Sequence, residues 1–160
     1  MTKKTSALVS IVGAVGLGGA VAQASTSRAT HAVHQSGKFA IVKSNNGSGP
    51  PQKGKYQNYA GTMSGAPGGR GTIHFDQVFS SQFNGNAVSI TGTATFIEPK
   101  GSYSGSISGT TGATGLHATV KITKGSGLSK GATGKVKITD PNAGEINKTT
   151  SFTVTGSIKY

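Results

Sequence analysis

The sequence predicts an all-β protein, an antiparallel barrel of about eight strands that forms one domain after an N-terminal leader. Apolar and polar residues alternate with a period of two along most of the chain after residue 37, and helical spacing is not sustained anywhere beyond the leader. Clusters of glycine, proline and asparagine separate the alternating segments, as in the turns between antiparallel strands.

The leader has the three parts of a secretory signal peptide. Lys3 and Lys4 precede an apolar run at residues 7–22, which ends in the cleavage pattern Ala22-Gln23-Ala24. The run is short for a membrane span, and its glycines lower its helix propensity. We therefore expect cleavage after Ala24, a secreted, extracellular protein, and no structural role for residues 1–24 in the fold.

Composition limits the possible functions of the mature chain. Removing 24 of the 160 residues leaves 136, which is enough for one domain with a hydrophobic core. The formal net charge falls only from +12 to +10, because the leader holds just two lysines. The chain has no cysteine, so packing and hydrogen bonds must hold the domain without disulfides. Export and the lack of aromatics between basic positions argue against nucleic-acid binding.

We expect residues 25–37 to be a flexible N-terminus and residues 38–160 to form the barrel domain. Residues 44–55, rich in glycine, proline and asparagine, predict a mobile loop. The clearest strand is at residues 88–96, where Val88, Ile90 and Phe96 alternate with serine and threonine. The other strands are expected at residues 38–43, 56–64, 71–79, 102–108, 116–123, 135–139 and 152–160.

The stretch "GSYSGSISGTTGATG" at residues 101–115 has the same alternation in its first half, with Tyr103 and Ile107 on one face. Its second half predicts a glycine-rich connection. Such one-sided strands leave a single apolar layer, which a second sheet or closure into a barrel must cover. Glycines inside the strand pattern favour a barrel over the alternative, a β-sandwich. They are Gly92, Gly105 and Gly156.

Three segments carry a resemblance: "GTMSGAPGGRGTIHF" (61–75), "GTATF" (92–96) and "GSGLSKGATGKVKIT" (125–139). They resemble small secreted bacterial domains related to the allene oxide cyclase and dirigent barrels. The resemblance implies an eight-stranded barrel with an apolar cavity, trimeric in many plant members. Plant dirigents steer the coupling of phenoxy radicals, and the cyclases bind an unstable fatty-acid epoxide. No catalytic residue of either group can be located in this chain.

Five residues are candidates for ligand binding. Phe96 and Tyr103 lie on the inward face of their predicted strands, and Glu98 continues that face towards a barrel mouth or a solvated turn. His74 and Asp76 share one face of a strand, either as a base with its orienting carboxylate or as an ordinary polar outer face. We predict no metal site and no cofactor.

Four lysines, Lys121, Lys135, Lys137 and Lys159, fall on the hydroxyl-rich face of the C-terminal strands. They predict either a patch for an anionic polymer or simple protection of solubility and strand edges. Our first hypothesis is a protein that binds a small apolar or aromatic molecule inside its barrel. The alternative is an extracellular surface or matrix protein that binds anionic polymer through this basic face. A cyclase-like or dirigent-like enzyme is third.

Overall fold

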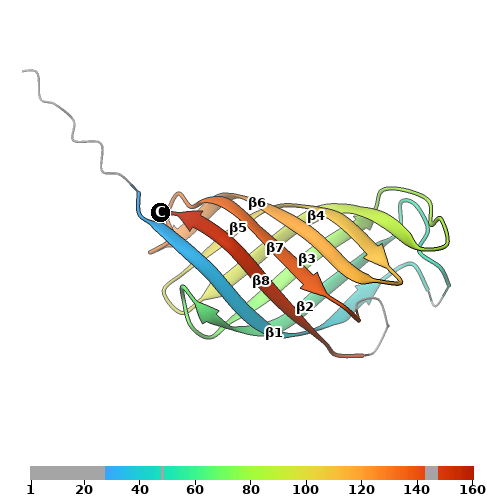
Figure 1. Cartoon of the computed structure of the whole chain (residues 1–160), viewed down its shortest axis with the longest axis horizontal. Coiled ribbons are helices and arrows are strands. Elements are labelled where there is room, and N and C mark those ends of the chain that lie inside the picture. Colours follow the sequence, from blue (N-terminus) through green and yellow to red (C-terminus); the bar gives the residue numbers. More distant parts are fainter. Residues whose placement is uncertain (1–27, 48, 143–147) are drawn as a thin grey trace, which may run out of the picture.

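The chain forms a closed barrel of eight antiparallel strands, as predicted, and the β-sandwich alternative is excluded (Figure 1). The computed structural model describes residues 28–47, 49–142 and 148–160, so the expected signal peptide lies outside the described residues. The strands are β1 (Thr30–Ser44), β2 (Tyr56–Ala66), β3 (Gly71–Phe79), β4 (Ala87–Glu98), β5 (Gly101–Gly112), β6 (Gly115–Gly127), β7 (Thr133–Asp140) and β8 (Thr150–Lys159).

Closure of the barrel depends on the long first strand. β1 pairs with β8 from Thr30 to Phe39 and with β2 from His34 to Ser44, so it joins the two ends of the sheet. We expected residues 25–37 to be flexible, but residues 30–37 belong to β1, and residues 25–27 lie outside the described residues. The pattern is hard to recognise because Gln35 and Gly37 take inward positions that usually hold apolar residues.

The strand β5 is also longer than expected. It continues to Gly112, because Thr110 and Thr111 pair with His117 and Leu116 of β6. The glycines within strands allow the close approach that strong coiling requires. A Cβ at Gly105 would collide with the backbone carbonyl of Lys121.

The two ends of the barrel differ in their connections. The first end carries the turns after β2, β4 and β6; the second end carries the connections after β1, β3, β5 and β7. Between β1 and β2, the buried Asn46 donates to the carbonyls of Gly49 and Pro50 and accepts from the amide of Gln52. This loop therefore has internal hydrogen bonds, while its expected mobility stays a prediction.

Candidate functional site

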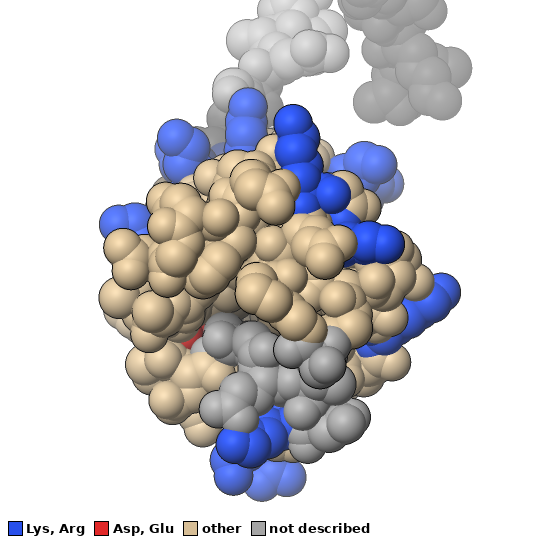
Figure 2. Space-filling model, turned by 90° about the vertical axis from the view of Figure 1, so that its right-hand side faces the viewer, with Lys and Arg blue, Asp and Glu red and all other residues tan. Residues whose placement is uncertain are grey.

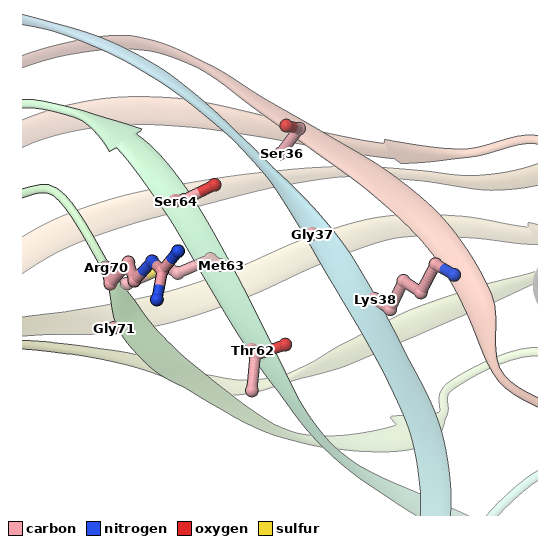
Figure 3. Close-up of a pocket in the computed structure, with 8 residues that line it drawn as sticks. All are labelled: Ser36, Gly37, Lys38, Thr62, Met63, Ser64, Arg70 and Gly71. Carbon is pink, nitrogen blue, oxygen red and sulfur yellow. The ribbon is translucent and has the colours of Figure 1, made fainter.

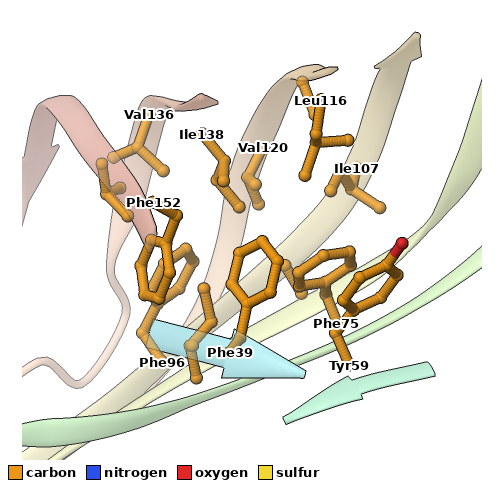
Figure 4. Packing of buried hydrophobic residues seen from close by; sticks show 14 of the residues in the cluster. Phe39, Tyr59, Phe75, Phe96, Ile107, Leu116, Val120, Val136, Ile138 and Phe152 are labelled. Atoms are coloured by element: carbon orange, nitrogen blue, oxygen red, sulfur yellow. The ribbon is translucent and has the colours of Figure 1, made fainter. Parts of the chain in front are cut away.

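The barrel interior is packed with side chains. Phe39 lies in the middle of an aromatic cluster, with its ring centroid 5.1 Å from Tyr59, 5.2 Å from Phe75 and 4.7 Å from Phe152. Aliphatic side chains of β6 and β7 face these rings (Figure 4). An eight-stranded barrel is just wide enough for side chains to fill it, and here bulky aromatic and aliphatic side chains do so.

Three of the candidate ligand-binding residues lie inside the barrel. Phe96 and Tyr103 are opposite each other on β4 and β5, and their rings stack at 4.8 Å. Glu98 lies towards the first end and is only 8% exposed. Gln35 Nε2 donates to Glu98 Oε1 at 2.6 Å, and the Tyr103 hydroxyl donates to Gln35 Oε1 at 3.1 Å.

This polar cluster is closed from outside by the turn after β2. A Cβ at Gly68 would collide with the Glu98 carboxylate, so the turn lies directly against that group. Burial raises the pKa of the Tyr103 hydroxyl well above its usual range, and the negative charge of Glu98 raises it further. The hydroxyl is therefore a hydrogen-bond donor at neutral pH and not a phenolate nucleophile.

A second polar cluster lies towards the other end. The Tyr59 hydroxyl donates to Gln57 Oε1 at 3.0 Å, and Gln77 Nε2 donates to the same oxygen at 3.3 Å. Gln77 is fully buried, and its Oε1 has no hydrogen-bond partner among the described residues. Burial raises the pKa of Tyr59 beyond its usual range, and Asp140 adds to the effect.

Asp140 itself has a structural place in this end of the barrel. It accepts from the amide of Asn142 at 2.8 Å and from the hydroxyl of Thr150, so it connects the end of β7 to the start of β8. Its side chain is fully buried. The sequence pattern did not single out Asp140 or the inward glutamines Gln35, Gln57 and Gln77, although their inward places in the alternation were the available signal.

His74 and Asp76 lie on the other side of the barrel wall. Both are exposed outward residues of β3, while Phe96, Tyr103 and Glu98 point inward. The five candidates therefore do not line one cavity. Among the described residues, no group of three His, Asp or Glu side chains is arranged to hold a metal ion.

The four predicted lysines come together on the outer surface. We define the lysine wall as Lys121 of β6, Lys135 and Lys137 of β7, and Lys159 of β8, all of them exposed. Lys121 and Lys135 are directly opposite each other across the β6–β7 pair. Residues in such pairs have Cβ atoms about 4.5–5.5 Å apart, and like charges there are destabilising.

Lysines in strands occur on one half of the barrel only. They belong to β6, β7, β8 and β1, which are consecutive around the barrel, whereas β2 to β5 contain no lysine or arginine. Two of the chain's four acidic residues, Glu98 and Asp140, are buried inside. Figure 2, which looks onto the second end, shows Lys and Arg side chains on several sides of the rim and only a small spot of acidic atoms.

Asp76 is the one exposed carboxylate in the described strands, and it lies on β3, opposite β7 in the ring of strands. Asp140 of β7 is buried inside the barrel, so the lysine wall has no exposed carboxylate in the strands that form it. The wall is therefore a concentrated positive surface with no exposed negative charge within it.

No protein-family model matches the chain, and no curated protein sequence matches it either. No helix in the described part of the chain is long and apolar enough to cross a membrane.

Proposed function

We propose that this is a secreted extracellular protein that binds an anionic polymer through the lysine wall. The observation that carries the proposal is the direct cross-strand pairing of Lys121 with Lys135, with no exposed carboxylate in the strands of the wall. A bound chain of negative charges relieves this repulsion, and several weak contacts on one polymer add up to a strong attachment. The expected signal peptide supports the extracellular location.

The close packing of the barrel interior favours binding on the outer surface over binding inside the barrel. The side chains that point into the barrel are buried against one another, and the ring contacts around Phe39 have ordinary packing distances. An interior ligand would have to displace such side chains, whereas the exposed lysines need no rearrangement to meet an anion.

The test is retention on immobilised polygalacturonate in a salt gradient. The quadruple variant Lys121→Gln, Lys135→Gln, Lys137→Gln and Lys159→Gln is compared with a control that carries Lys43→Gln, Lys53→Gln, Lys55→Gln and Lys100→Gln. Both variants lose four charges, so only the position differs. We expect the wall variant to elute at much lower salt than the control. Equal losses would show attraction by net charge alone and contradict the proposal.

A second candidate, the small apolar or aromatic ligand inside the barrel, is supported by the orphaned Gln77 Oε1. A buried acceptor without a partner costs about 1–3 kcal/mol, so a hydroxyl-bearing molecule that reached it would be held there. Native mass spectrometry of the secreted protein tests this candidate. An extra mass that is absent from Gln77→Met supports it, and a bare polypeptide mass speaks against it. The same spectrum tests the trimer that the resemblance implies.

A further inference from the structure

A groove of about 400 Å³ lies on the outside of the barrel across β1, β2 and β3. Figure 3 shows Lys38 and Arg70 towards opposite sides of the groove, with residues of β2 between them. Three exposed hydroxyl side chains line it: Ser36, Thr62 and Ser64. Gly37, Met63 and Gly71, all at inward positions of their strands, line the groove between these hydroxyl residues.

The shape of the groove depends on its glycines. A Cβ at Gly37 would collide with the carbonyl of Thr62, and one at Gly71 would collide with the carbonyl of Ile97. Adjacent backbones thus approach each other so closely that larger residues do not fit. The strand backbones therefore fix these positions of the groove, and only the surrounding side chains are free to adjust.

The lining combines two kinds of recognition group. The planar guanidinium of Arg70 presents paired donors that match a carboxylate, and Lys38 provides a second cation. The three hydroxyls both donate and accept, as the hydroxyls of a sugar ring do. Lys43, also on β1, shows the contrast, because its Nζ lies 5.8 Å from the centre of the Tyr56 ring and it does not line the groove.

The groove adjoins the proposed polymer surface. β8 is the single strand between β1, which carries Lys38, and β7, which carries Lys135 and Lys137. Neighbouring strands are about 4.8 Å apart, so the backbones of β1 and β7 are roughly 10 Å apart around the wall. One polymer chain can therefore contact both places.

We propose that this groove binds one acidic sugar residue, with the carboxylate held by Arg70 and the ring hydroxyls by Ser36, Thr62 and Ser64, while Lys38 on the opposite side adds positive charge. The proposal rests on the proposed function, since it assigns the sugar-reading subsite of a polymer that the lysine wall holds by charge. The groove supplies the selectivity that a row of lysines lacks.

Titration of the labelled protein with trigalacturonate, followed by amide NMR, tests the proposal. We expect the largest shifts at Gly37, Thr62 and Gly71, and at least a tenfold weaker Kd in the double variant Lys38→Gln and Arg70→Gln. A control with Lys43→Gln and Lys100→Gln loses the same charge and should bind normally. Ser64→Tyr keeps the charge but fills the groove, and it should also weaken binding at least tenfold.

Neutral galactotriose and inorganic phosphate at equal ionic strength complete the test. Binding of either with the affinity of trigalacturonate, shifts that map outside the groove, or equal loss in the control would overturn the groove proposal. If trigalacturonate does not bind in the groove while the lysine-wall variant is still retained less on polygalacturonate, the proposed function stands without the groove proposal. If trigalacturonate binds the groove but the protein is not retained on polygalacturonate, the proposed function is contradicted instead.

Discussion

Two neighbouring parts of the barrel surface have the same backbone and opposite character. We compare the lysine wall with the hydroxyl wall, the outward positions of β4 and β5. In the hydroxyl wall Thr93 is opposite Ser106, whereas in the lysine wall Lys121 is opposite Lys135. The hydroxyl pair is neutral and small, and the lysine pair repels. The fold accepts both, because outward positions contribute little to the core.

The inner faces behind the two walls also differ. Behind the lysine wall most of the inward side chains are aliphatic, including Val120, Val136 and Ile138, and Figure 4 shows these three facing aromatic rings. Behind the hydroxyl wall, Phe96 stacks on Tyr103, which bonds to the polar cluster of Gln35 and Glu98. Two ionisable groups, the Tyr103 hydroxyl and the Glu98 carboxylate, thus lie behind the uncharged outer surface.

The largest effect is expected from the aromatic cluster around Phe39, which includes Phe152 behind the lysine wall. Phe39→Ala should lower the free energy of unfolding by about 3–5 kcal/mol, because it removes a ring that contacts three others. Ile138→Val, behind the lysine wall, should cost only about 0.5–1.5 kcal/mol. Urea denaturation measures both, and Phe39→Leu serves if the alanine variant does not fold. Equal costs would show that the rings are loosely packed.

A pH effect should distinguish the interior of the hydroxyl wall. Burial raises the pKa of Tyr103, so in strong base the unfolded chain loses this proton and the native chain keeps it. The native state then binds more protons, and stability falls with rising pH above the ordinary tyrosine value near 10, with a slope of up to about 1.4 kcal/mol per pH unit.

Tyr103→Phe should remove this contribution from the slope. Urea denaturation at several pH values above about 9 measures it. The lysines are the same in both proteins, so their own titration cancels in the comparison. An unchanged slope would mean that Tyr103 reaches solvent in the native state.

The smallest effect should come from the outer pairs. Lys121→Glu places opposite charges across the β6–β7 pair and should stabilise the fold by about 0.2–1 kcal/mol at low salt. The converse double variant, Thr93→Lys with Ser106→Lys, should lose a similar amount by copying the repulsion into the hydroxyl wall. Thermal unfolding at low and high salt measures both, and effects that persist at high salt would contradict an electrostatic cause.

Much of this fold could be predicted from alternation alone. Residues 88–96 gave the clearest pattern, and β4 spans Ala87–Glu98 with Val88, Ile90 and Phe96 buried. The beginning of β1 could not be predicted, because Gln35 and Gly37 interrupt the apolar series. In a closed barrel, pairing with two neighbours compensates for such weak positions.

The candidate sites also contain one part that the sequence predicted and another that it did not. The outward place of the lysines followed from the alternation, since one side of each strand faces water. The contact of Glu98 with Gln35 did not, because these residues are 63 positions apart and meet only when β1 comes close to β4 inside the closed barrel. The groove of Lys38 and Arg70 was missed for the same reason.

The sequence by itself determined which side of each strand faces the core, because side chains alternate along any extended chain. The clusters of turn residues between the alternating segments also indicated the number of strands. Only the tertiary structure decided which outward residues become neighbours, since the register between strands sets that. Pairing placed Lys121 opposite Lys135 and enclosed Glu98, and closure brought β1 beside β8. The sequence thus determined which strands carry lysine, while closure of the sheet brought these strands together on one half of the barrel.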